Sequence, residues 1–259
     1  LLLDFWWSFF CEVHLMFPGI GTVINICSII VGSLLGVLIG KKLGDKLRTL
    51  ITDVLGCITA ISAADALAAY WSKDLQSSMP DGWPILVIVF SLLGGAIIGN
   101  WMRLEDRLEN LGIRLRDKFA KNNSSSFVEG FVSASLIFVI GPLAILGSIS
   151  DGMGTGIDQL VLKSTLDGFT SIAFAASLGW GVALSSLPVG VVQFFWTGVG
   201  LFLGTVLADY QIAAMTAVGG VLLIGISLRL LKIREIAVAN LLPALALAPL
   251  LSLVVNKYI

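Results

Sequence analysis

Runs of about 20 apolar residues recur along the whole chain, and this feature limits the folds open to it more than any other. An α-helix needs about 20 residues to cross the hydrocarbon core of a bilayer. Hydrophobic residues make up 57% of the 259 residues and charged residues only 13%, whereas about half of a soluble domain is apolar. The sequence therefore predicts an all-α integral membrane protein with a single transmembrane helical domain.

The apolar runs, read against glycine, proline and charged residues, give eight expected transmembrane helices. Only the short segment "SSLP" separates the fifth from the sixth, so a re-entrant fifth segment would leave seven. Residues 1–15 are expected to be an N-terminal extension ahead of a membrane domain over residues 16–259. The spans are expected at residues 18–40, 51–71, 83–102, 127–149, 163–184, 187–207, 211–230 and 236–255.

Lysine and arginine indicate the orientation, because they concentrate in the cytoplasmic loops of membrane proteins. With eight spans, thirteen of the sixteen basic residues follow the first, third and seventh spans and share one side, while Lys73, Lys163 and Lys257 lie opposite. The basic side is therefore expected to be cytoplasmic, with both termini outside the inner membrane of the cell. Nine acids lie on or near the outer side, where they would either attract cations or only solvate the loops.

Residues 103–121, "RLEDRLENLGIRLRDKFAK", have the pattern of an amphipathic helix. Leucines at three- and four-residue spacing share one face, and basic residues occupy much of the rest. We expect a cytoplasmic helix that lies on anionic lipid. Docking to a partner protein is the alternative.

Small residues recur every fourth position in the first, third and sixth spans, which predicts close packing of helices. The first and third spans run inward and the sixth runs outward, so spans three to five and six to eight are expected to form inverted three-helix repeats, as in many secondary transporters. Breaks are expected at Gly141-Pro142, Pro243 and Pro249, either as cavity-lining carbonyls or as simple kinks. The small residues are Gly32, Gly36, Gly40, Gly95, Gly99, Gly200, Gly204 and Ala208.

Polar residues inside membrane spans are costly and therefore mark candidate sites. The richest stretch opens the fifth span, where Ser164, Asp167, Thr170 and Ser171 follow each other at spacings that share a helix face. Hard oxygen ligands of this kind suit sodium, calcium or a proton relay, although a carboxylate in the first turn of a helix is favourable without any ligand. Asp151 is expected at the outer mouth of this site.

Four further polar residues lie in other spans. Amides commonly form hydrogen bonds between neighbouring membrane helices, so each of these is also explained by helix packing. The residues are Asn25, Asp65, Gln193 and Asn240.

The sequence has few residues that could form a catalytic site or bind a cofactor. His14 is the only histidine, and Cys11, Cys27 and Cys57 have neither metal-ligand nor redox spacing. "GMGTG" lacks the residues of a nucleotide-binding loop, and Asp65 with Asp167 is the only deep pair for an aspartate protease. We expect no cofactor, no nucleic-acid partner and no enzymatic activity.

Four segments resemble a bacterial multi-pass membrane family known as domain of unknown function 554. They are residues 21–43, 127–152 ("FVEGFVSASLIFVIGPLAILGSISDG"), 163–182 ("KSTLDGFTSIAFAASLGWGV") and 217–251. The resemblance covers most of the chain from about Met16 onward. It implies a sodium channel or pump, and it brings no ligand residues that can be transferred.

These observations lead to three hypotheses. The first is a homo-oligomeric inner-membrane channel or secondary transporter for sodium or protons, which uses the candidate residues above. The second is a non-transporting structural or assembly subunit of a larger membrane complex. The third is a membrane enzyme that modifies lipid.

Overall fold

Helices are the only regular secondary structure in the part of the chain that the structure describes, as the apolar runs predict. The computed structural model describes residues 17–40, 42, 44–119, 125–140, 142–154, 156–203 and 207–258. The expected extension, residues 1–15, lies outside them. The elements are α2 (Ile20–Gly40), α3 (Asp45–Ala68), η1 (Ala69–Trp71), α4 (Lys73–Gln76), α5 (Trp83–Met102), α6 (Leu104–Phe119), α7 (Ser125–Val139), α8 (Pro142–Met153), α9 (Asp158–Leu178), α10 (Gly181–Leu184), α11 (Ser186–Leu203), α12 (Asp209–Leu230), η2 (Val238–Leu241) and α13 (Pro243–Tyr258).

Several of these helices can cross a membrane. Among the described residues, six stretches are long and apolar enough, and the bent pair formed by α7 and α8 makes a seventh if it counts as one span. The helix α9, expected as the fifth span, is long enough but is not among them, because Lys163, Asp167 and several hydroxyl residues lower its apolar content. An eighth span therefore stays a prediction for α9.

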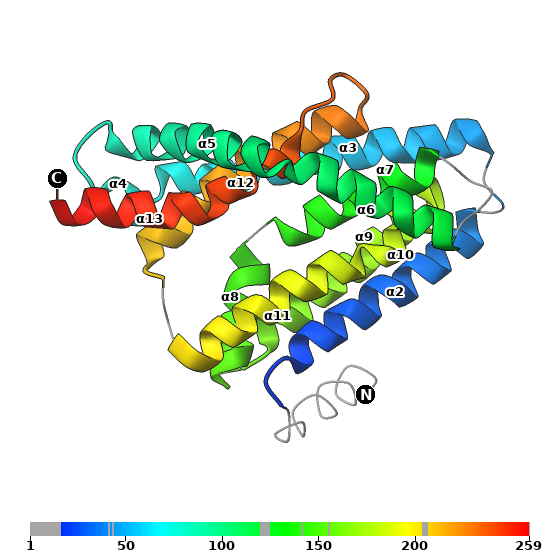
Figure 1. Ribbon diagram of the computed structural model, residues 1–259, viewed down its shortest axis with the longest axis horizontal. Coiled ribbons are helices and arrows are strands. Elements are labelled where there is room, and N and C mark those ends of the chain that lie inside the picture. Colours follow the sequence, from blue (N-terminus) through cyan, green and yellow to red (C-terminus); the bar gives the residue numbers. More distant parts are fainter. Residues whose placement is uncertain are drawn as a thin grey trace.

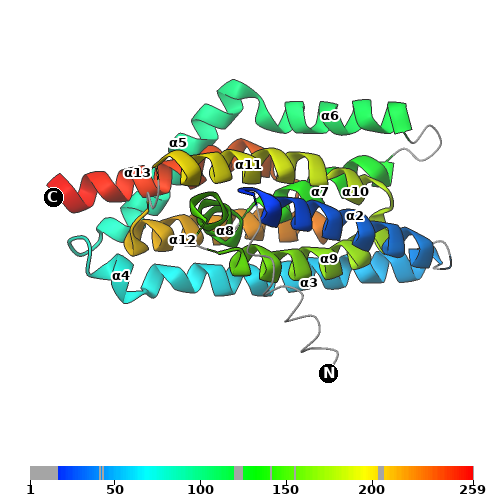
Figure 2. The ribbon, with the colours of Figure 1, turned by 90° about the horizontal axis from the view of Figure 1, so that it is seen from below.

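The long helices run back and forth between two ends of the bundle (Figures 1 and 2). One end, called the basic end below, is formed by the end of α2, the start of α3, α6, the start of α7 and residues 231–237. The opposite end holds α4, residues 156–157 and the C-terminal part of α13, where Asn256 donates to the carbonyl of Ser78 at 2.7 Å. Described basic residues at the basic end include Lys42, Arg103, Arg107, Arg114, Arg116, Arg229, Lys232 and Arg234.

The helices α2 and α9 run side by side in the same direction along the lower right of Figure 1. Three glycines of α2 allow this approach, because a methyl group at any of them would overlap the backbone of α9. The contacts advance by four residues on both helices, so the two helices are parallel and in register. The pairs are Gly32 with the carbonyl oxygen of Gly168, Gly36 with that of Ile172, and Gly40 with that of Ala176.

The other predicted packing faces also make close contacts. Gly95 and Gly99 of α5 lie against Ala244 and Asn240, and Gly200 of α11 lies against Ile149 of α8. Helix packing by small residues is therefore confirmed, with Gly204 outside the described residues. The inverted repeat stays a prediction.

The expected helix breaks differ in kind. The α7–α8 pair bends by 61° ahead of Leu143, with Gly141 outside the described residues. Pro249 lies inside α13, and its carbonyl accepts hydrogen bonds from Gln211 and Ser252. Pro243 is the first residue of α13 and follows η2 after one residue, so it lies where these two helices join within the candidate span Val238–Tyr258.

The amphipathic helix α6 forms as predicted and follows α5 after a single residue. Its Leu104, Leu108 and Leu115 are partly buried against the hydrophobic core, and Gly112 lies against the ring of Phe131. Much of the apolar face therefore contacts the protein itself. A position on a lipid surface stays a prediction for this helix.

Candidate functional site

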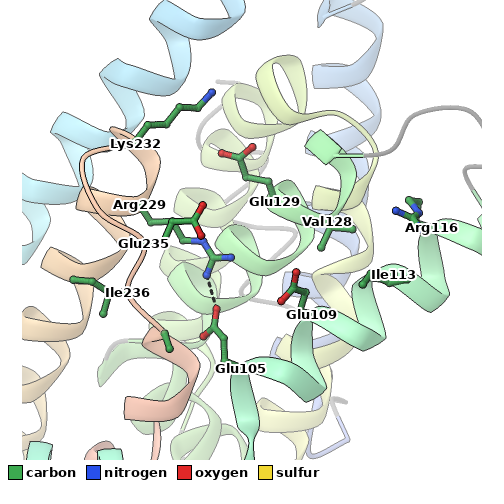
Figure 3. Close-up of a pocket in the computed structure, with 11 residues that line it drawn as sticks. Glu105, Glu109, Ile113, Arg116, Val128, Glu129, Arg229, Lys232, Glu235 and Ile236 are labelled. Carbon is green, nitrogen blue, oxygen red and sulfur yellow. Dashed lines mark hydrogen bonds and ion pairs between the residues drawn. The ribbon is translucent and has the colours of Figure 1, made fainter. Parts of the chain in front are cut away.

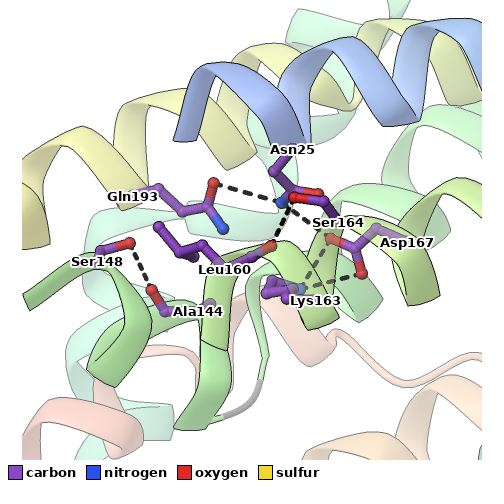
Figure 4. Close-up of polar contacts among 8 residues, drawn as sticks. All are labelled: Asn25, Ala144, Ser148, Leu160, Lys163, Ser164, Asp167 and Gln193. Carbon is purple, nitrogen blue, oxygen red and sulfur yellow. Dashed lines mark hydrogen bonds and ion pairs between the residues drawn. The ribbon is translucent and has the colours of Figure 1, made fainter. Parts of the chain in front are cut away.

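A buried ion pair lies within α9 (Figure 4). The ammonium of Lys163 is 3.0 Å from Oδ1 and 2.8 Å from Oδ2 of Asp167. The residues are one helical turn apart, and each is 6% exposed. An isolated charge in this environment would cost several kcal/mol, about the effective penalty for one buried ion. Each residue therefore depends on the other for its place in the bundle.

Two amides from neighbouring helices extend this ion pair, because Asn25 contacts Asp167 and Gln193 contacts Asn25. Asn25 on α2 donates through Nδ2 to Oδ2 of Asp167 at 3.0 Å and to Oε1 of Gln193 at 3.3 Å. Gln193 lies on α11, so three helices meet at this point. Both amides are almost fully buried. A polar cluster of Asn25, Lys163, Asp167 and Gln193 thus lies inside the bundle.

The cluster carries polar atoms that have no hydrogen-bond partner among the described residues. They include Oδ1 of Asn25 and Nε2 of Gln193, together with the hydroxyls of Thr22 and Ser171. Thr22 lies one turn before Asn25, and Ser171 lies one turn after Asp167. Burial of an unsatisfied polar group costs about 1–3 kcal/mol. Of these groups, the Asn25 amide is bonded to Asp167, so its unpartnered oxygen and the carboxylate lie in one place where a small cation or a proton carrier can bind.

The remaining predicted site residues have other surroundings. The Ser164 hydroxyl donates to the carbonyl of Leu160 in its own helix at 2.6 Å, and Thr170 is only partly buried. Asp65 is exposed on α3. Asn240 lies near the basic end, where its side-chain oxygen accepts from the backbone N–H of Glu105 at 2.9 Å. Asp65 and Asn240 therefore lie apart from the cluster around Asp167.

Asp151 binds the start of α2. Its carboxylate accepts from the backbone N–H groups of Gly19 at 3.1 Å and Gly21 at 3.0 Å. The N-terminus of a helix has unsatisfied donors and a positive partial charge, so a carboxylate there is favourable. Asp151 thus joins α8 to α2, in addition to its expected place near the outer mouth.

The sequence interpretation missed the part played by Lys163. It treated this residue as a lone basic residue outside the basic clusters. The signal was its spacing, because a lysine four residues before an aspartate faces it on the same side of a helix. No group of three or more His, Cys, Asp or Glu side chains in the described part of the chain is placed to hold a metal ion.

A cavity of about 820 Å³ opens at the basic end (Figure 3). An ion pair between Glu105 of α6 and Arg229 of α12 crosses it. A smaller cavity of about 190 Å³ shares Glu129 and Lys232 with it and reaches Ser177 near the end of α9. The sequence analysis did not identify the larger cavity. It is lined by Glu105, Glu109, Ile113, Arg116, Val128, Glu129, Arg229, Lys232, Glu235, Ile236 and Ala237.

The bundle of candidate spans with a charged cluster inside it defines a multi-span helical membrane protein. The family comparison makes this more specific. The model of the family described as "Protein of unknown function (DUF554)" matches residues 20–253. The chain belongs to this family, as the resemblance of its segments predicted.

Two curated proteins are similar over nearly their whole lengths. The "Uncharacterized membrane protein YdfK" of Bacillus subtilis (strain 168) is 31% identical over 243 residues, which cover 92% of this chain and 97% of that protein. The "Uncharacterized protein YqgA" of Escherichia coli (strain K12) is 29% identical over 237 residues, which cover 90% and 96%. No solved structure matches the chain.

Proposed function

We propose that the protein is a cation channel or secondary transporter that moves sodium or protons, with the carboxylate of Asp167 at the centre of its site. One observation carries the proposal: Asp167 is buried where α2, α9 and α11 meet, among polar atoms that have no protein partner in the described residues. Charged groups inside membrane bundles commonly mark ion pathways. Helix packing alone does not require these unsatisfied oxygens.

Lys163 determines how a cation could bind at this carboxylate. Its ammonium already contacts both oxygens of Asp167, so an incoming cation has to displace it. Lys163 lies five residues into α9, and its long side chain can turn toward the end of the bundle that holds Asp158. Asp167 would then alternate between Lys163 and the transported ion.

The exposed apolar side chains of the bundle indicate what surrounds it. Large apolar side chains of α5 and α11 are exposed, among them Trp101 at 84% and Phe202 at 82%. Such side chains suit contact with membrane lipid or with a second copy of the chain. The positive-inside rule places the basic end in the cytoplasm of an inner-membrane protein, with both termini outside.

Flux measurements on purified protein in sealed vesicles test the proposal. We expect sodium- or proton-dependent flux in the wild type and its loss in Asp167→Asn. The matched control is Asp65→Asn, which makes the same change at an exposed aspartate outside the cluster. Full flux in Asp167→Asn would contradict the proposed site. Absence of flux in the wild type would instead favour the non-transporting subunit.

A further inference from the structure

The helix α6 forms one wall of the larger cavity at the basic end. It contributes Glu105, Glu109, Ile113 and Arg116, while the facing wall comes from α7, the end of α12 and residues 235–237 (Figure 3). The helix therefore covers the cavity along its length. An outward movement of α6 would widen the mouth of the cavity.

The joint between α5 and α6 is a single residue. Arg103 adopts a φ of 51°, in the left-handed region that residues other than glycine rarely occupy. Its backbone N–H still bonds to the carbonyl of Asn100 at 3.0 Å, which closes α5. A change at this one residue can therefore alter the direction of α6 without disturbing α5.

Glu105, in the first turn of α6, holds this wall against the facing one. Its Oε1 accepts from Arg229 at 2.5 Å, and its Oε2 accepts from the backbone N–H of Ala239 at 2.8 Å. Its own backbone N–H donates to the side chain of Asn240 at 2.9 Å. One residue thus makes one bond to α12 and two to η2, and two of the three use its charged carboxylate. Charge-assisted hydrogen bonds of this kind are the stronger ones.

The cavity leads toward the candidate site along α9. The smaller cavity extends it from Glu129 and Lys232 to Ser177. Between Ser177 and the unpartnered hydroxyl of Ser171, the buried ring of Phe174 fills the bundle. The structure therefore has a polar approach from the basic end that reaches Ser177, ten residues or about three turns of α9 from Asp167.

We propose that this cavity is the entrance from the basic end to the Asp167 site, and that α6 is its lid with Glu105 as the latch. The assignment of the cavity as an entrance rests on the proposed function. The lid does not, because its movement changes access to the cavity whether or not an ion is transported.

Cysteine accessibility tests the lid. Val128→Cys places a thiol in the cavity wall, in a background that lacks Cys11, Cys27 and Cys57. A charged, membrane-impermeant thiol reagent is applied to purified protein in detergent. Adding Glu105→Gln is expected to raise the labelling rate about tenfold, which is the effect of losing a charged hydrogen bond of the closed state. The matched control, Asp106→Asn, removes the charge of an exposed acid that follows Glu105 in α6 but does not line the cavity, and it should leave the rate unchanged.

Arg229→Gln provides a second variant, because it removes the same ion pair from the opposite wall and leaves Glu105 bonded to Ala239. It should raise the labelling rate as well. The proposal that α6 is a lid would be overturned if the labelling rate were the same in the parent, Glu105→Gln and Arg229→Gln proteins. The three proteins should have the same elution volume on size exclusion. An increase in Asp106→Asn as large as that in Glu105→Gln would also overturn the lid.

Flux in vesicles tests the entrance separately. A bulky reagent attached at residue 128 should stop the cation flux that the unmodified Val128→Cys protein supports. Unchanged flux after complete labelling would overturn the entrance and leave the proposed function standing. Absence of flux before labelling would overturn the proposed function and, with it, the entrance.

Discussion

Lys163 and Asp167 contact each other through both carboxylate oxygens, one helical turn apart and almost completely buried. The pair is neutral as a unit, but either residue alone leaves a charge in a low-dielectric interior. The stability of α9 inside the bundle and the chemistry proposed for Asp167 therefore depend on the same contact. Variants of the two residues can separate these roles.

Asp167→Asn is expected to lower stability strongly, by about 3–5 kcal/mol, because it leaves the ammonium of Lys163 buried without a counter-charge. The double variant Lys163→Met with Asp167→Leu should recover most of this loss, since no charge remains. Thermal unfolding in detergent measures both. A double variant as unstable as Asp167→Asn would show that the pair is not the source of the effect. Recovery of folding without flux would assign transport to the charged pair and not to the stability of the bundle.

Lys163→Gln is expected to make thermal stability depend on cations. The variant leaves the Asp167 carboxylate without its ammonium, among the oxygens of Asn25 and Ser171, so a bound sodium ion would restore neutrality. A ligand that binds only the folded state raises the unfolding temperature, and the rise grows with the ratio of ligand concentration to its dissociation constant. Sodium chloride should therefore raise the unfolding temperature more than choline chloride does.

The double variant of Lys163 and Asp167 is the control for this measurement, because it has no carboxylate to neutralise. Its response to sodium and to choline should be the same. A sodium-specific rise in the double variant, or none in Lys163→Gln, would argue against cation binding at Asp167.

The sequence could predict the helices and one side of the candidate site, because both depend on local patterns. Apolar runs mark the spans, and spacing along α9 places Ser164, Asp167 and Ser171 on one face. The partners of that face depend on which helices pack together. Asn25 reaches Asp167 because α2 packs in parallel register on α9, and Gln193 reaches Asn25 because α11 packs against α2. No pattern within one span carries this information.

The same reason separates the remaining candidates. Asp65 and Asn240 share the polar character of the cluster residues, yet tertiary packing leaves one exposed and brings the other to α6. The cavity at the basic end was missed for a related reason. Glu105 and Arg229 are 124 positions apart, and each alone resembles an ordinary solvated charge at a helix end.

Gly36→Ala tests the close contact between α2 and α9. The added methyl group would overlap the carbonyl oxygen of Ile172 and the side chain of Ala175, and overpacking of this kind typically costs about 1–3 kcal/mol. Gly198→Ala is the matched control, since no atom lies within 4 Å of the added methyl group and alanine is the better helix former by up to about 1 kcal/mol. The unfolding temperature should fall for Gly36→Ala and should stay level or rise for Gly198→Ala. Equal changes in the two variants would contradict the register of α2 on α9.

Asp151→Ala tests the carboxylate that binds the start of α2. The change removes the acceptor for Gly19 and Gly21, whose N–H groups are then left without their partner at a helix N-terminus. Loss of a helix cap typically lowers stability by about 1 kcal/mol, and here the carboxylate is also buried. Amide hydrogen exchange should therefore rise in the first turn of α2, with a lower unfolding temperature. Asp158→Ala removes an exposed carboxylate from the first turn of α9 and should leave exchange in α2 unchanged. If both variants affected α2 alike, the connection between α8 and α2 through Asp151 would be excluded, because only a general loss of negative charge at this end of the bundle would explain the result.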